Sequence, residues 1–97
     1  MSYADTIAKA RRLAILLALY FSPGYTLPRA ALRDQVSATG YVMSGDLAAT
    51  EIAWLTEQGL VDTLQLDAVR LTARGEDIAL GRSQNPGVRR PSPGEVT

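Results

Sequence analysis

The 97 residues of this chain are enough for one hydrophobic core and too few for two independent domains. The chain has neither cysteine nor histidine, which excludes disulfides and thiolate metal sites and removes the commonest general base. Its ten basic and ten acidic residues cancel, and its hydrophobic fraction of 46% is that of an ordinary globular protein.

The first third of the chain predicts one long helix, from about Ala4 to Ser22. One apolar stripe recurs at alternating spacings of three and four residues, which predicts a buried helix face: Ile7, Ala10, Ala14, Leu17 and Phe21. A second stripe lies beside it: Leu13, Leu16 and Tyr20. A helix apolar nearly all round is either the central core helix or one shared with a partner subunit.

The apolar run of residues 13–21 is not a targeting or membrane segment. It has no small-residue cleavage site after it, and it is too short to span a bilayer. We therefore expect a cytoplasmic protein without a membrane partner.

Two shorter helices follow, joined by a turn. Pro23 and Gly24 end the first helix, and residues 25–27 form a short extended link. The second helix starts at Pro28, where a missing N–H costs nothing, and closes near Gly40.

Either Ser44 or Asp46 caps the third helix, which extends to Gln58. Its predicted core face, at i, i+4 and i+7, consists of Ala48, Ile52 and Leu55. The remaining larger side chains are expected on its flanks and outward face: Leu47, Thr50, Glu51, Trp54 and Gln58.

A β-hairpin and a fourth helix complete the folded part. Residues 60–66 alternate as a strand does, and residues 69–71 pair back across Asp67 and Ala68. Thr72 then caps a helix that extends to Gly81. This order of elements predicts a mainly α fold with a small β wing, a winged helix-turn-helix domain over residues 1–81.

Residues 82–97 predict a flexible tail that contains prolines and arginines. The segment has three prolines and two glycines, and its few apolar residues cannot bury enough surface to fold alone. Arg89 and Arg90 stand between prolines, an arrangement that is typical of a linear docking motif.

The zero net charge hides a strong asymmetry along the chain. Residues 1–33 hold five bases and one acid, residues 34–69 hold six acids and no base, and residues 70–97 hold five bases and three acids. A DNA-binding domain usually concentrates Lys and Arg on its contact face. Here the acids surround the helix that such domains place in the major groove.

Catalysis is not expected from these residues. Glu76 and Asp77 are adjacent on a helix and point in different directions, and Lys9, the only lysine, has no serine at a supporting spacing. No phosphate-binding loop or metal-ligand cluster is present either. The sequence therefore predicts a protein that is not an enzyme and uses neither metal nor cofactor.

The basic residues give candidate contacts to DNA phosphates. Arg29 and Arg33 lie on the first helix of the helix-turn-helix, which crosses the DNA backbone in the usual docking geometry. Arg70 in the wing and Arg74 at the start of the fourth helix are further candidates, and Arg11 and Arg12 could grip phosphate too. The alternative is a solvated face with weak ion pairs.

Leu47 and Trp54 give a candidate protein interface instead. They lie about two turns apart on the third helix, and a Leu–Trp pair beside Glu51 suits a protein partner and repels DNA. The alternative is that Trp54 packs inside the domain, as a lone tryptophan in a small protein usually does.

Two resemblances bear on this choice. The elements Gly59-Leu60-Val61 and Leu71-Thr72-Ala73-Arg74-Gly75 resemble those of winged-helix repressors of the MarR and ArsR type. Metal-sensing ArsR repressors hold their metal with Cys or His, so metal sensing is not implied here.

Nearly the whole chain resembles a family of small proteins of Mu-like phages and prophages, often described as ArsR-like by fold. The similar segments are residues 4–7, 11–13, 54–59, 71–75 and 86–94. The resemblance implies a phage-encoded protein in the cytoplasm of a bacterial host, and by analogy a docking role for residues 86–93.

Two functions remain open. The first is a non-enzymatic, nucleic-acid-associated role, as a transcription regulator or in DNA packaging, on double-stranded DNA. The second is a winged helix repurposed as a protein-interaction adaptor for another phage protein, because of its acidic recognition helix. In either case we expect a homodimer whose contacts are the first and fourth helices.

Overall fold

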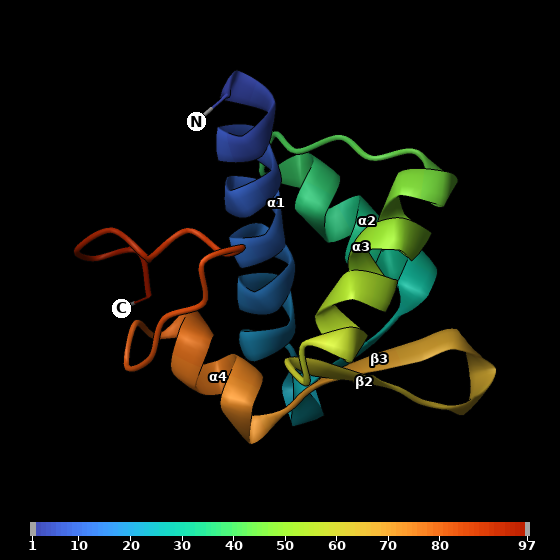
Figure 1. The fold of residues 1–97 in the computed structure, drawn as a ribbon. Coiled ribbons are helices and arrows are strands. Elements are labelled where there is room, and N and C mark those ends of the chain that lie inside the picture. The colour runs from blue at the N-terminus through green and yellow to red at the C-terminus, as the bar shows by residue number, and fades with distance from the viewer. Residues whose placement is uncertain (1, 97) are drawn as a thin grey trace.

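Helix α1 (Tyr3–Tyr20) passes through the middle of the fold, and the other elements pack around it (Figure 1). The computed structural model describes residues 2–96. Ser2 caps the helix, because its side-chain oxygen accepts the backbone N–H of Asp5 at 3.1 Å. The buried residues of α1 are Ala10, Leu13, Ile15, Leu16 and Leu19.

The buried face predicted for α1 is confirmed only in part. In that stripe only Ala10 is buried, while Phe21 at the C-terminal end is 61% exposed and the residues between are partly exposed. The stripe that contains Leu13 and Leu16 forms the core instead. Both stripes are apolar, and spacing alone does not tell which of them meets the chain's own core.

Helices α2 (Arg29–Ala38) and α3 (Gly45–Glu57) are joined by residues 39–44. Ser44 caps α3 by accepting the N–H of Leu47 at 3.0 Å. The core face predicted for this helix is confirmed, since its three members are buried: Ala48, Ile52 and Leu55.

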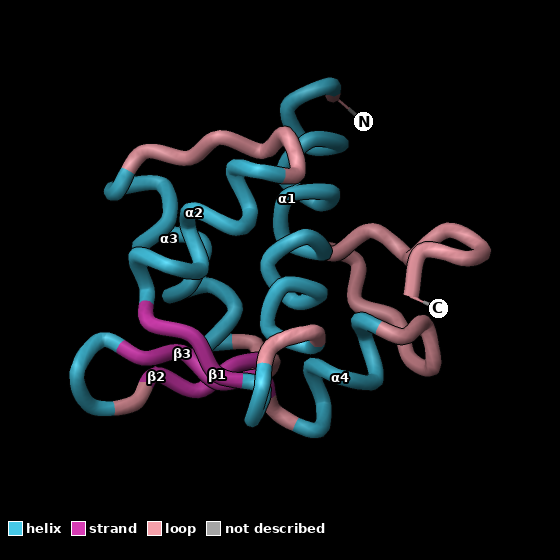
Figure 2. The backbone as a smooth tube through the Cα atoms, turned by 180° about the vertical axis from the view of Figure 1, so that it is seen from behind, coloured by secondary structure: helices cyan, strands magenta, loops and turns pink. Residues whose placement is uncertain are grey.

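The strands form a small antiparallel sheet below the helices (Figure 2). They are β1 (Thr26–Pro28), β2 (Val61–Thr63) and β3 (Ala68–Leu71), in the order β1-β3-β2. The hairpin predicted from the sequence is confirmed, although its turn lies at Gln65–Asp67, slightly earlier than expected, and the extended link predicted over residues 25–27 contributes most of β1. Residues 2–96 thus form a mainly helical fold with a three-stranded sheet.

Helix α4 (Ala73–Ala79) follows β3 directly and packs against α1. The hydroxyl of Thr72 accepts the N–H of Gly75 at 2.9 Å and donates to the carbonyl of Gly59 at 2.8 Å. This residue therefore caps α4 as predicted and also ties it to the end of α3. Among the helices of residues 2–96, none has the length and apolar character needed to cross a membrane.

We expect Gly75→Ala to destabilise the fold. A Cβ at this position would overlap the carbonyl oxygen of Leu60 and crowd Leu71, and backbone cannot move aside as a flexible side chain does. The free energy of unfolding should fall by about 3 kcal/mol. Urea denaturation followed by circular dichroism measures this.

The matched control is Gly45→Ala at the start of α3. A Cβ there meets only the end of the Arg33 side chain, at 3.7 Å. This variant should keep or slightly raise the stability, by less than about 1 kcal/mol. Equal losses in the two variants would contradict the close approach of α4 to Leu60.

Candidate functional site

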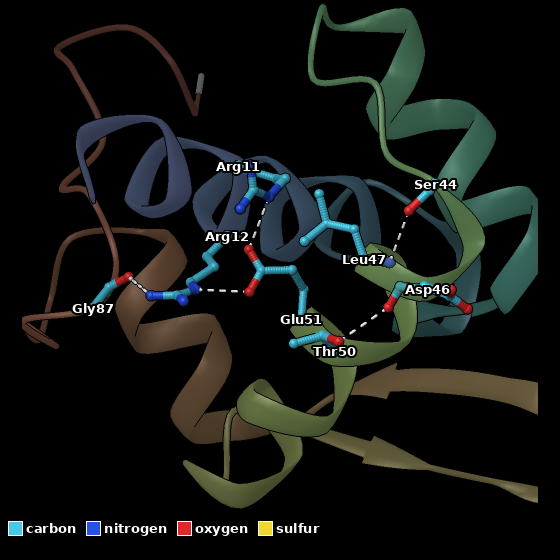
Figure 3. A network of polar contacts seen from close by, with 8 residues as sticks. All are labelled: Arg11, Arg12, Ser44, Asp46, Leu47, Thr50, Glu51 and Gly87. Atoms are coloured by element: carbon cyan, nitrogen blue, oxygen red, sulfur yellow. Dashed lines mark hydrogen bonds and ion pairs between the residues drawn. The ribbon is translucent and has the colours of Figure 1, made fainter. Parts of the chain in front are cut away.

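Glu51 projects from the middle of α3 toward α1 and is only 2% exposed. Arg11 donates its Nε–H to Oε2 of Glu51 at 2.9 Å, and Arg12 donates its Nε–H to Oε1 at 3.1 Å (Figure 3). The expectation that Glu51 lies on the outward face of its helix is therefore wrong. One buried carboxylate is held between two cations, and both arginines point inward rather than toward a phosphate backbone.

Arg12 makes further contacts that fasten the C-terminal segment. Its Nη1 donates to the carbonyl of Gly87 at 3.1 Å, and its guanidinium lies over the ring of Trp54 at 4.2 Å. A Cβ at Gly87 would overlap the same ring, so the backbone lies directly against Trp54 at this residue. Trp54 is thus covered by Arg12 and by the tail.

Residues 82–96 lie beside α1 and α4, as Figure 1 shows. Val88 is buried, the backbone N–H of Arg89 donates to the carbonyl of Lys9 at 3.2 Å, and Asn85 donates to Gln58 at 3.1 Å. The sequence predicts a flexible tail, and its mobility stays a prediction. The structure adds the position at which this segment packs.

An ion pair between Arg89 and Glu95 holds the end of the tail in a turn. The backbone N–H of Ser92 donates to Glu95 at 2.7 Å and lowers the pKa of Glu95 below its ordinary value. Arg89, at 2.8 Å from the carboxylate, lowers it further, while partial burial opposes both effects. Glu95 is therefore held ionised, and this ion pair weakens as the pH falls through the lowered pKa.

The two candidate interface residues on α3 do not form an exposed apolar patch. Leu47 and Trp54 are both partly buried and pack against the core. In the tail, Arg89 is partly buried, while Arg90 is exposed and donates to the carbonyl of Gly81 at 3.3 Å. The interface predicted from Leu47 and Trp54 is therefore closed by the chain itself.

The four candidate DNA contacts are spread over three elements. Arg29 and Arg33 on α2 line one cavity of about 300 Å³ near the start of α3. Arg33 is also engaged there, since its Nε donates to the carbonyl of Met43 at 2.7 Å. Arg70 on β3 lies 3.6 Å from Asp62, and Arg74 is exposed at the start of α4.

The exposed face of α3 is small and acidic. Besides Gly45 at its start, its exposed residues are Asp46, Ala49, Thr50, Ala53 and Glu57. Ala49 and Ala53 at its centre have short side chains that leave the helix backbone accessible. Asp46 lies near one end of this face and Glu57 near the other. This face lies on the side of α3 away from Glu51 and α1.

The tip of the β2–β3 hairpin presents an apolar side chain. Leu66 is 97% exposed and has a φ of 61°, and Asp67 beside it has a φ of 57°. Non-glycine residues rarely adopt this left-handed conformation.

Within residues 2–96, no group of three or more acidic side chains gathers as a metal site would require.

We expect Arg12→Ala to release the tail and Arg11→Ala to leave it in place. Arg12 bridges Glu51, Gly87 and Trp54, whereas Arg11 contacts the same carboxylate without touching the tail. Each variant should lower the free energy of unfolding by about 2 kcal/mol. Only Arg12→Ala should speed tryptic cleavage after Arg89, since Pro91 blocks cleavage after Arg90.

The cleavage is measured by mass spectrometry of brief digests, under conditions in which both variants are fully folded. Mapping the cut sites separates tail release from global unfolding, which would also allow cleavage after Arg33 and Arg70, whose peptide bonds lie within α2 and β3. Equal cleavage of the tail in the two variants would show that Arg12 does not hold it.

Neither a family model nor a solved structure matches the chain. A protein of Escherichia phage Mu, named uncharacterized protein gp26, is 38% identical over 92 residues, covering 92% of this chain and 95% of the phage protein. An uncharacterized protein of Haemophilus influenzae is 34% identical over 61 residues, covering 63% of this chain and 59% of that protein.

The similarity to the Mu protein extends over nearly the full length of both chains, which confirms the resemblance to Mu-like phage proteins. The ArsR-like description finds no support in the name of either relative. The chain belongs to a family of Mu-like phage proteins that includes gp26 of phage Mu.

Proposed function

We propose that this protein is a winged-helix, non-enzymatic adaptor of a Mu-like phage, which works as a homodimer and binds a basic surface of another phage protein. The winged-helix assignment is supported by the succession of α2, a short turn, α3 and a hairpin, with β1 added at the edge of the sheet. In such domains α3 and the hairpin form the binding surface.

The observation that carries the adaptor proposal is the charge of that surface. Five acids of residues 34–69 are exposed, and Glu51 is the only one taken inside. The exposed acids are Asp34, Asp46, Glu57, Asp62 and Asp67. On α3 itself no base accompanies them. A phosphate backbone is repelled by such a face, whereas a basic protein surface is attracted to it.

The shape of the surface agrees with a protein partner. Ala49 and Ala53 form a shallow strip along α3 on which another element can pack closely. Leu66 at the hairpin tip offers an apolar side chain where a DNA-binding wing commonly offers a cation. Asp46 and Glu57 on α3, with Arg29 of α2 beside the two alanines, surround this small apolar centre as the polar rim surrounds the core of an ordinary protein interface.

Nucleic-acid binding is a second candidate, supported by the cavity between α2 and α3. Arg29 and Arg33 both line it, and Gly45, the first residue of α3, contributes the positive end of a helix. Nε of Arg29 is buried and has no hydrogen-bond partner within residues 2–96. A phosphate oxygen would satisfy it, and this role would make the chain a regulator or a packaging-linked protein.

We expect the protein not to bind random-sequence duplex DNA at micromolar concentration and about 50 mM salt, where phosphate contacts are strongest. Fluorescence anisotropy of a labelled duplex measures this. The double variant Asp46→Lys, Glu57→Lys should gain binding, because it reverses the charge of the exposed face of α3.

The second candidate predicts the opposite result. Binding that weakens steeply with salt, and that is lost in Arg29→Ala but kept in Arg82→Ala, would favour phosphate contacts at the cavity over the adaptor. Arg82 is the matched control because it is an exposed arginine beyond α4 that pairs with Asp77 at 3.3 Å.

We further expect a photo-crosslinking residue at Ala49 or at Leu66 to trap the same phage protein in cells where the phage develops. Both positions are exposed on the proposed surface. The same residue at Ser83, exposed at the start of the tail, is the control and should trap neither this partner nor DNA.

The charge reversal on α3 should abolish these crosslinks, and the trapped protein should carry a basic patch. Mass spectrometry of the crosslinked species identifies it. Crosslinks that persist after Asp46→Lys, Glu57→Lys, or that form only from Ser83, would overturn the adaptor proposal.

A further inference from the structure

One apolar face of α1 is only partly covered by the chain itself: its two ends are exposed, while Ala10 near its middle is buried. Its members are Tyr3, Ile7, Ala10, Ala14, Leu17 and Phe21. Tyr3 is 81% and Phe21 is 61% exposed, and the face lies opposite the buried Ile15, Leu16 and Leu19. A monomer rarely leaves a continuous apolar stripe along a whole helix in water.

The part of this face from Ala10 to Phe21 lies on the floor of an open groove of about 490 Å³. The floor is formed by Ala10, Ala14, Leu17, Ala18 and Phe21. One wall is α2 with the turn after it, and the other is the tail. In Figure 2 the backbone of α1 lies between these two segments. A helix face bounded on both sides is shaped to receive an elongated apolar element.

The order of side chains along the stripe is the same from either end. Successive members are separated by four, three, four, three and four residues. The two end members are aromatic, the next are aliphatic, and the central two are both alanine. The alternation of three and four is the repeat by which helices pack along a seam.

Such a stripe is complementary to itself when two helices run in opposite directions. A two-fold axis makes residue i meet residue j and residue j meet residue i. Centred between the alanines, that axis places Tyr3 against Phe21 and Ile7 against Leu17 of the second copy. Ala10 then meets Ala14 at the crossing, where small side chains let two helices approach to about 8 Å.

The charges around the groove also suit a second copy of this chain. The six residues of the stripe are uncharged, and the wall of Gln35, Thr39 and Tyr41 is neutral. The opposite wall carries Arg89 and Glu95, which pair at 2.8 Å and have no net charge. Two such faces do not repel each other, whereas nucleic acid finds no excess of cations here.

We propose that this face of α1 is the homodimer interface, and that the α1 helices of two copies pack antiparallel with Tyr3 against Phe21 of the second copy. The inference rests on the homodimer proposed above and is independent of the partner of α3. Oligomeric state and disulfide geometry therefore test it separately from the crosslinking of Ala49 and Leu66.

Sedimentation equilibrium is the first measurement. The protein should sediment with twice the 10.4 kDa mass of one chain. Tyr3→Glu with Phe21→Glu should raise the dissociation constant about tenfold or more, because like charges then face each other at both ends of the interface. Tyr3→Lys with Phe21→Glu places opposite charges there and should restore much of the dimer.

The register is tested with single cysteines, which the natural chain lacks. Both end residues are exposed, so Tyr3→Cys and Phe21→Cys should leave the monomer fold intact. An oxidised mixture of the two variants should form a disulfide-linked dimer. Neither variant alone should do so, since like ends lie about 27 Å apart in an antiparallel pair.

Any of three results would overturn the proposal. A chain that stays monomeric at several hundred micromolar would leave this face to a different protein. Disulfide-linked dimers that form when each variant is oxidised alone, and not between the two variants in the mixture, would show that the α1 helices pack parallel. Unchanged dimerisation in Tyr3→Glu, Phe21→Glu would place the interface elsewhere on the molecule.

Discussion

The ion pair of Glu51 with Arg11 and Arg12 is the contact on which the arrangement of this small fold depends. It joins the middle of α3 to the middle of α1, which supplies much of the core. A charge taken out of water is tolerated only where partners satisfy it, so the carboxylate fixes how α3 is rotated about its axis. That rotation turns Ala49 and Ala53 outward and decides which surface the protein offers to others.

Arg12 of this ion pair also holds the tail in place. Arg12 is shared by the carboxylate of Glu51, the carbonyl of Gly87 and the ring of Trp54. Residues 82–96 have too few apolar side chains to form a core of their own, and they pack instead against apolar and polar groups of the folded domain. The contact that orients α3 thus also covers its tryptophan, and the small and acidic residues on the other side of the helix remain exposed.

Local signals were sufficient to predict the elements. Ser44 and Thr72 each cap a helix through a side-chain oxygen, and the break at Pro23 and Gly24 ends α1. Long-range pairing was not predictable in the same way. An acid on an amphipathic helix is usually solvated, and nothing local in the sequence indicates that Glu51 meets Arg11 and Arg12 some forty residues away. The adjacent arginines were the available signal, since two cations on an apolar helix need a counter-charge or water.

The misassigned stripe of α1 has a similar cause and a functional consequence. Periodicity identifies a face that is buried somewhere, and it does not distinguish burial in the chain's own core from burial against a second chain. If α1 pairs with its copy, the exposed faces of both α3 helices remain free, because each lies on the side of α3 away from α1. A dimer then presents two acidic surfaces at a fixed separation, and a partner with two basic sites gains affinity from their linkage without any new contact.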